Sequence, residues 1–157
     1  MTIDSIAVTT EDLPELDMRF ISSRPLFSIT APSEPKSISG RRDRWWIDGD
    51  SGKTLILHYW IFGSHEEAIQ AAIKGRYRIT AKRFSIHEGR KSVYQIENES
   101  EWIFGDSTWR AKNNILFVKD KVVVLVKELG NNISLTTTRN VAWEILNKVE
   151  EALLTEI

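Results

Sequence analysis

Cysteine is absent from the 157 residues of this chain, and so is any long hydrophobic run. Without a thiol, the chain can form no disulfide, no thiolate nucleophile and no cysteine-based zinc site. The longest apolar stretches, residues 55–62 and 115–126, are interrupted by polar side chains and have the length of strands. A membrane-spanning helix needs about 20 apolar residues, so we expect no membrane span.

A leader segment is also missing from the first residues, MTIDSIAVTTEDLPELD, which contain no basic segment followed by an apolar one. We therefore expect no signal peptide, which favours the cytoplasm; an extracytoplasmic location is the alternative if a leader has been removed. Hydrophobic residues make up 41% of the chain and charged residues 27%. These proportions exclude the composition of a disordered chain and are typical of a soluble globular domain.

Proline is confined to the first quarter of the chain. Because proline interrupts helices and strands, we predict an extended N-terminal arm over residues 1–40, with at most short elements near residues 3–8 and 16–21. Residues 41–157 are then predicted to form a single α+β domain. The prolines concerned are Pro14, Pro25, Pro32 and Pro35.

Two β-hairpins are predicted where strand-forming residues flank turn formers. At residues 44–62, DGDSGK stands between RWWI and TLILHYWIF, which is rich in β-branched and aromatic residues. At residues 114–128, NILFVKDKVVVLVKE turns near its KDK, and its nearly unbroken apolar arms indicate central strands that are covered on both faces. Two further strands are predicted at residues 77–84 and 92–97.

Two main helices are predicted after these hairpins. Ser64 and Glu67 have the spacing of a capping box, so the first helix is predicted at about residues 64–74. An apolar stripe predicts the second helix at about residues 138–154. The predicted fold class is therefore α+β, with an antiparallel sheet built from hairpins and packed with two main helices.

The hexapeptides WIDGDS (46–51) and WIFGDS (102–107) agree at five of six positions. Each accompanies a hairpin followed by a helix, so one hypothesis is that two ββα units, residues 44–74 and 109–154, arose by duplication. Gly-Asp-Ser is also ordinary turn chemistry, because Gly and Asp adopt positive φ at little cost and Asp and Ser side chains bond nearby amides. We interpret both copies as turns, since one cause then explains the two.

The first copy continues as GDSGKT, which has an outward likeness to a phosphate-binding loop and to a calcium loop. The pattern GxxxxGK[ST] needs a glycine where Ile47 stands, and it must open a helix, whereas LILHYWIF is typical of a strand. A calcium loop that starts at Asp48 needs a glutamate at its twelfth position, which is Tyr59. We therefore expect neither site, no bound metal and no cofactor.

The stretch IFGDSTWRAKNN resembles the first block of the Gly-Asp-Ser-Leu esterases and lipases. The resemblance implies a serine nucleophile at Ser107. In that family a later Asp-x-x-His block supplies the base, but no histidine follows Ser107 in this chain; its histidines are His58, His65 and His87. Because a serine nucleophile needs a base within hydrogen-bond reach, we expect no hydrolase.

Residues 105–154 are similar in outline to the closing half of small uncharacterised bacterial secreted or lipoprotein domains. The likeness consists of a Gly-Asp-x-x-Trp stretch, the hairpin ILFVKDKVVVLV and a terminal amphipathic helix. It implies an antiparallel sheet flanked by helices and a module without catalytic activity. The residues that carry it are Gly105, Asp106, Trp109, Phe117 and Val118.

Basic residues concentrate in the middle of the chain, where residues 41–93 contain 11 Lys and Arg against 6 Asp and Glu. Guanidinium groups beside indoles can bind phosphate and stack on bases. Along a strand, Arg44 and Trp46 point one way and Trp45 the other, so we expect at least one indole in the core. The candidate ligand-binding residues are Arg41, Arg42, Arg44, Trp45, Arg76, Arg78, Trp109 and Arg110.

No complete catalytic constellation is found, so we predict a non-catalytic binding or interaction domain for a protein or small-molecule partner. The alternative is a nucleic-acid or anion-binding domain that uses the basic Trp/Arg-rich face of residues 41–83. A third hypothesis is an enzyme whose site combines His58 or His87 with a distant carboxylate. A homo-oligomer is a further hypothesis, if the apolar central strands leave a sheet face uncovered.

Overall fold

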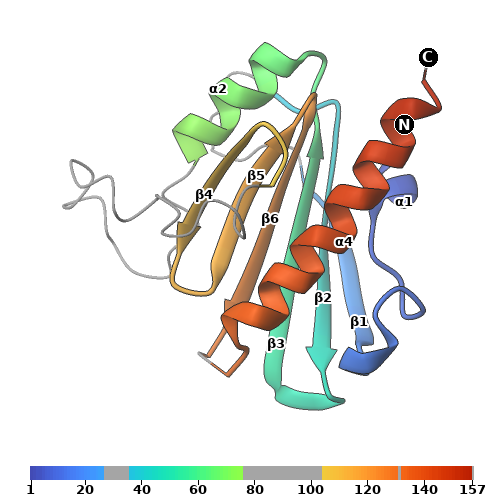
Figure 1. Cartoon of the computed structure of the whole chain (residues 1–157), viewed down its shortest axis with the longest axis vertical. Helices are drawn as coiled ribbons and strands as arrows, with labels where there is room; N and C mark the ends of the chain where they lie inside the picture. The colour runs from blue at the N-terminus through green and yellow to red at the C-terminus, as the bar shows by residue number, and fades with distance from the viewer. Residues whose placement is uncertain (27–35, 76–103, 131, 157) are drawn as a thin grey trace.

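A computed structural model of the chain describes residues 1–26, 36–75, 104–130 and 132–156. These residues form a six-stranded antiparallel sheet with the strand order β1-β2-β3-β6-β5-β4, and helices pack on both of its faces (Figure 1). The predicted α+β class with an antiparallel sheet is confirmed. The strands predicted at residues 77–84 and 92–97 lie outside the described residues.

The first predicted hairpin consists of β2 (Ser39–Ile47) and β3 (Asp50–Ile61). Asp48 and Gly49 form its turn, with φ angles of 56° and 62°. Two successive positive φ angles match the twist of a hairpin, and Asp-Gly is one of the pairs that favour them. β3 therefore begins earlier than expected, because the turn uses only two residues of the stretch DGDSGK.

The second predicted hairpin consists of β5 (Asn114–Lys119) and β6 (Val122–Leu129). Its turn contains Asp120, which has a φ of 52°. β4 (Ser107–Ala111) pairs with the outer side of β5, and the two hairpins meet in the middle of the sheet where β6 pairs with β3. Five residues of β5 and six of β6 are buried, as expected for central strands.

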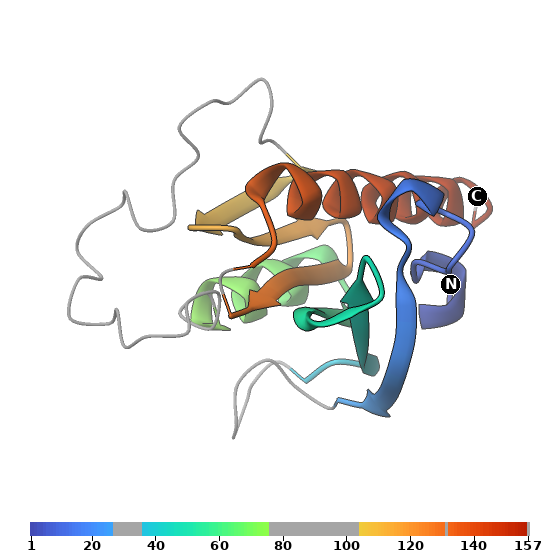
Figure 2. The same cartoon turned by 90° about the horizontal axis from the view of Figure 1, so that it is seen from below.

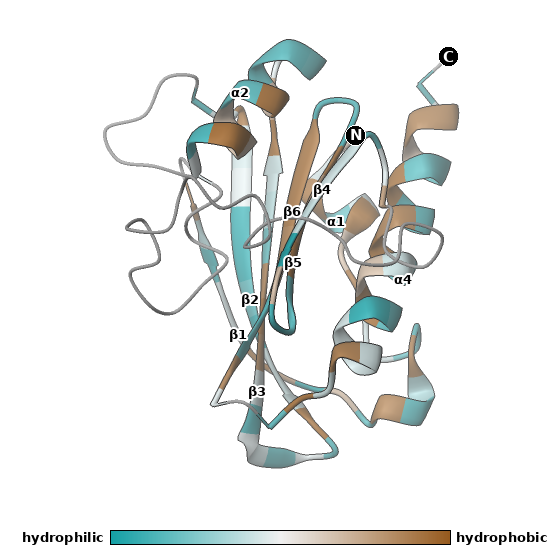
Figure 3. Cartoon of the chain, turned by 60° about the vertical axis from the view of Figure 1, so that its left-hand side comes forward, coloured by the Kyte–Doolittle hydropathy of each residue, from teal (hydrophilic) through white to brown (hydrophobic). Residues whose placement is uncertain are grey.

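Two helices cover opposite faces of the sheet, α4 (Leu135–Leu154) on one face and α2 (His65–Gly75) on the other (Figures 1 and 2). Hydrophobic and hydrophilic residues alternate along both helices (Figure 3). Leu57 and Tyr59 of β3 belong to the core under α4, whereas Trp60 belongs to the core under α2. Because side chains alternate along a strand, each central strand contributes to both cores.

Both helices begin beside a serine cap. The hydroxyl of Ser64 accepts a hydrogen bond from the backbone N–H of Glu67 at 3.2 Å, which confirms the predicted cap of α2. The side chain of Ser134 accepts a hydrogen bond from the backbone N–H of Thr137, and α4 therefore starts before the predicted residue 138. The first turn of α4 contains threonines, whose low helix propensity concealed it in the sequence.

The first 26 residues, for which we expected an extended arm, contribute to the sheet and to its core. α1 (Ile3–Ile6) and η1 (Pro14–Leu16) are short helices, and the side chains of Ile6 and Val8 are buried. β1 (Arg19–Pro25) pairs with β2, although all seven of its residues are exposed. A strand without a buried face lacks apolar alternation, which is the signal used to find strands in sequences.

β1 is an edge strand of the sheet, and its features bear on self-association. It has a bulge between Phe20 and Ser22 and ends at Pro25, and both features oppose pairing with another chain. In the described part of the chain, the apolar residues of β3, β5 and β6 are buried within a single copy. The hypothesis of a homo-oligomer rested on an uncovered apolar sheet face, and these described strands do not present one. Oligomerisation stays a prediction.

Tyr59 connects the N-terminal segment to the sheet. Its side chain is fully buried, and its hydroxyl accepts a hydrogen bond from the backbone N–H of Val8 at 3.2 Å. Burial raises the pKa of the Tyr59 hydroxyl, because a phenolate at this position would lose its hydration. The folded state therefore keeps the neutral phenol to a higher pH than the unfolded state does.

The raised pKa of Tyr59 predicts a loss of stability in alkali. Tyrosine in an unfolded chain ionises near pH 10, so the contribution of Tyr59 is complete below about pH 10 and falls as the pH rises above it. Tyr59→Phe should cost about 1 kcal/mol at neutral pH, because the N–H of Val8 loses its partner, and should flatten the alkaline decline. Urea unfolding of the parent and of Tyr59→Phe between about pH 8 and pH 11 measures how the stability of each declines. The other tyrosines are common to both proteins, so a difference between the two declines reports on Tyr59. Equal declines would contradict the prediction.

Candidate functional site

The charged side chains of β2 lie on both faces of the sheet. Trp45 and Ile47 belong to the core under α4, so Asp43 and Arg41, which alternate with them, lie on the same face. We call this the inner face of β1 and β2. The intervening residues of β2 lie on the opposite, outer face.

On the inner face, Arg41 is held by two carboxylates. Its Nε and Nη2 donate to the two carboxylate oxygens of Asp43 at 2.9 and 2.8 Å, and its Nη1 donates to Asp4 at 2.5 Å. The hydroxyl of Ser23 donates to Asp43 at 2.7 Å, and the guanidinium lies 5.9 Å from the ring centre of Tyr59. Burial alone would lower the pKa of Arg41, but the hydrogen bonds to the two carboxylates raise it overall. Arg41 is therefore a structural cation.

Trp45 also lies on the inner face, where it is 3% exposed. The ring of Phe20 packs against it edge-on, with ring centres 5.2 Å apart. The expectation that one indole of the pair belongs to the core is confirmed. A buried ring has no surface on which a ligand could stack, and the neighbouring indole of Trp46 lies on the outer face.

The outer face carries four arginines and this second indole. In the pairing of β1 with β2, Arg24 lies opposite Arg42, and Arg19 lies opposite Trp46. Three of the arginines are exposed, whereas Arg42 and Trp46 are half-buried. We call the following set the arginine face: Arg19, Arg24, Arg42, Arg44 and Trp46.

Positive charge on the arginine face is not balanced locally. The other outer-face residues of β1 and β2 in the ladder, Ser22 and Gly40, are neutral. Burial lowers the pKa of Arg42, and the charges of Arg24 and Arg44 lower it further. Within the described residues, no carboxylate forms an ion pair with these three arginines. Arg24, Arg42 and Arg44 of the arginine face are therefore adjacent cations that repel one another.

The remaining candidates from the sequence do not join this face. Arg76 and Arg78 lie outside the described residues. Trp109 and Arg110 lie on β4, at the opposite edge of the sheet, with three strands between β4 and β2. Trp109 packs against the core under α2, and Nη1 of Arg110 donates to the carbonyl of Lys112 at 3.2 Å.

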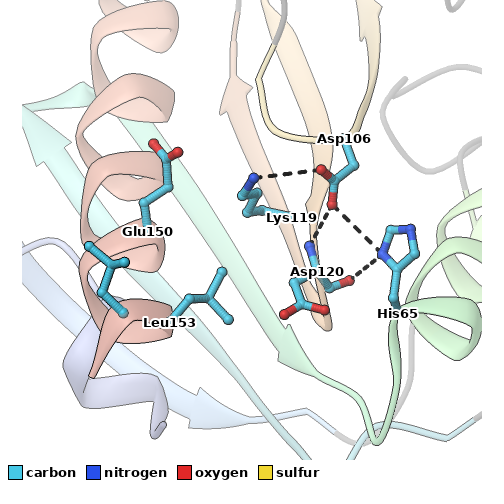
Figure 4. A pocket seen from close by; sticks show the side chains of 7 residues that line it. His65, Asp106, Lys119, Asp120, Glu150 and Leu153 are labelled. Carbon is cyan, nitrogen blue, oxygen red and sulfur yellow. Dashed lines mark hydrogen bonds and ion pairs between the residues drawn. The ribbon is translucent and has the colours of Figure 1, made fainter. Parts of the chain in front are cut away.

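A separate cleft of about 650 Å³ opens between one end of the sheet and the last turns of α4 (Figure 4). Four segments of the chain contribute to it: the start of α2, the loop before β4, the β5–β6 turn and α4. Figure 4 shows Glu150 and Leu153 on the helix side, facing a cluster of polar side chains on the sheet side. The lining residues are His65, Asp106, Lys119, Asp120, Glu150, Leu153 and Leu154.

Asp106 connects the polar side chains of this cleft. Its Oδ2 accepts the backbone N–H of Asp120 at 2.7 Å and lies 3.7 Å from Nδ1 of His65, and its Oδ1 lies 3.6 Å from Nζ of Lys119. Nδ1 of His65 is also 2.8 Å from the carbonyl oxygen of Asp120. A carbonyl only accepts, so Nδ1 carries the proton and is not available as a base. These contacts fix the β5–β6 turn against α2.

The cleft does not complete the esterase-like pattern. No hydrogen bond joins the hydroxyl of Ser107 to any part of the chain that the structure describes. A nucleophilic serine would need a base in contact with it, and the histidine of this cleft uses Nδ1 to bind the turn. The contact between His65 and Asp106 was not predicted, because it depends on where α2 lies relative to the sheet.

Both Gly-Asp-Ser stretches have the geometry of turns. Gly49 and Gly105 have φ angles of 62° and 69°. Asp50 accepts a hydrogen bond from the amide two residues further on at 2.8 Å, and Asp106 accepts one from the β5–β6 turn at 2.7 Å. The interpretation as turns is confirmed. The two stretches are not equivalent in the fold, since the first closes the β2–β3 hairpin and the second precedes β4.

The described segments contain no group of three or more side chains that could hold a metal ion, and none of their helices has the length and hydrophobicity needed to cross a membrane. A comparison of the chain with models of protein families, with curated proteins and with solved structures gives no match. The function is therefore inferred from the geometry and charge of the chain itself.

Proposed function

We propose that this chain is a non-catalytic binding domain whose arginine face binds an anionic, phosphate-bearing partner. One observation carries the proposal: the pairing of β1 with β2 places three guanidinium groups, those of Arg24, Arg42 and Arg44, side by side on one face of the sheet. Burial lowers the pKa of Arg42, and the charges of Arg24 and Arg44 lower it further. An anion placed among them replaces repulsion with attraction. Guanidinium groups suit phosphate in particular, because their planar forks match pairs of phosphate oxygens.

The contrast between the two faces supports this assignment. On the inner face, the charge of Arg41 is matched by Asp43 and Asp4, so that face has no cation left for a ligand. On the outer face, Arg24 and Arg44 are exposed to solvent and Arg42 is half-buried between them. Alternation along β2 therefore separates a structural arginine from arginines that remain open to a partner.

The proposal predicts binding of inorganic polyphosphate at low ionic strength. Arg42→Ala/Arg44→Ala should weaken this binding at least about tenfold and make its salt dependence less steep, because fewer counterions are displaced. Fluorescence anisotropy of a labelled polyphosphate chain, titrated at several salt concentrations, measures both effects.

Arg110→Ala/Lys112→Ala is the matched control, because it removes the same charge from the opposite edge of the sheet. At about 0.1 M salt this variant should bind within about twofold of the parent. Four strand spacings separate β4 from β2, which is about 19 Å, whereas the Debye length at this salt concentration is about 10 Å. Equal losses in the two double variants, or no binding by the parent at low salt, would overturn the proposal.

A further inference from the structure

We infer that the partner of the arginine face is a single-stranded nucleic acid that lies extended along β2. This inference rests on the proposed function and names the ligand class of the same site. Two features of the arginine face support it: the linear order of its cations and the indole at the end of the row.

The cations of β2 form a row along one side of the strand. Arg42, Arg44 and Trp46 alternate with inner-face residues, so neighbours in the row are about 6.6 to 6.8 Å apart. Arg24 and Arg19 of β1 flank the two ends of this row. A single phosphate would reach only part of such a row, whereas an extended polyanion presents a charge to each member.

The indole of Trp46 indicates a nucleic acid as the ligand and not a polyanion without bases. Trp46 is half-buried and lies on the same face as Arg42 and Arg44, whereas Trp45 is enclosed in the core. Aromatic side chains beside a basic groove are stacking sites for bases, and such stacking accepts every base. Arginine planes can add to it. The face therefore fits unpaired bases better than phosphate groups alone.

A comparison of ligands on the same protein tests this inference. The ligands are a labelled 12-nucleotide oligo-dT, the corresponding duplex, inorganic polyphosphate of equal charge, and vesicles of anionic lipid. We expect the single strand to bind most tightly, with a log-log salt slope that becomes shallower by about 1.4 in Arg42→Ala/Arg44→Ala, because each phosphate contact contributes about 0.7.

Trp46 supplies the second readout. Trp46→Leu should weaken oligo-dT binding about tenfold and leave polyphosphate binding unchanged, because only the oligonucleotide stacks. Trp46→Phe keeps an aromatic ring and should retain most of the affinity. Thermal unfolding of each variant, followed by circular dichroism, verifies that the fold is intact. If Trp46→Leu does not fold, Trp46→Val, which also lacks a ring and has a high strand propensity, carries the same expectation.

The outcomes distinguish the inference from the function on which it rests. If polyphosphate, duplex or vesicles bind as tightly as oligo-dT, or if loss of the indole leaves oligo-dT binding unchanged, the single-stranded nucleic acid is ruled out while an anion-binding face remains. If none of the four ligands binds at low salt, the proposed function fails as well. A preference for oligo-dT that depends on both Trp46 and the arginines supports the inference.

Discussion

Replacing Asp43 with alanine is expected to lower the free energy of unfolding by about 3 kcal/mol, because it leaves a partly buried guanidinium without its main partner. Asp43 is 1% exposed and receives two hydrogen bonds from Arg41 and one from Ser23. The expected loss is at the lower end for a buried ion pair, since the Arg41 side chain keeps 26% of its exposure and its contact with Asp4. Urea unfolding at neutral pH measures the change.

Arg41→Met/Asp43→Ala is the control that separates the unpaired charge from the loss of packing. Replacing both members of a buried pair usually costs less than removing one of them, so the double variant should be more stable than Asp43→Ala alone. If it is equally unstable or less stable, the ion pair is not the cause, and the effect of Asp43→Ala comes from packing or from Ser23.

Gly105→Ala is expected to destabilise the chain by about 3 kcal/mol, the sum of two costs. Gly105 has a φ of 69°, and a residue with a Cβ pays about 1 to 2 kcal/mol to adopt the left-handed region. The added Cβ would also meet the backbone carbonyl oxygen of Val118, closer than van der Waals contact allows, and overpacking of this kind costs a further 1 to 3 kcal/mol, roughly. Thermal or urea unfolding measures the sum.

The other Gly-Asp-Ser stretch supplies a matched control. Gly49 has nearly the same backbone angle, a φ of 62°, but a Cβ there would meet only side-chain atoms, the nearest being Nη2 of Arg19 at 3.4 Å. Gly49→Ala should therefore cost only about 1 kcal/mol, the part that comes from the backbone. Equal losses at the two positions would show that the carbonyl of Val118 yields and that the backbone angle alone sets the requirement for glycine.

The parts of the fold that the sequence predicts are those with a local cause. Both central hairpins and both main helices follow from side-chain periodicity, from turn residues such as Asp48 and Gly49, and from the cap at Ser64. β1 was not predicted as a strand, because it has no buried face and is held by its pairing with β2. Periodicity reports burial, so an exposed edge strand leaves no trace in it.

The candidate site was predictable to the extent that it depends on alternation within one strand. The opposite orientation of Trp45 and Trp46 follows from the period of β2, but the sequence does not say which of the two faces the core. Arg24 was not a candidate, because only the pairing of β1 with β2 brings it beside Arg42. Arg41, by contrast, was predicted to bind a ligand, but its guanidinium group is hydrogen-bonded to Asp43. The sequence does not reveal these hydrogen bonds.

The pairing of β3 with β6 has a consequence for the order in which the chain folds. It joins residues 54–61 to residues 122–129, whereas each hairpin pairs strands that a two-residue turn connects. Contacts between neighbours in sequence form quickly, but distant strands must first overcome the entropy of closing a long loop. We therefore expect the two hairpins to form early and independently. The pairing of β3 with β6, which joins the two hairpins into one sheet, should then set the folding rate.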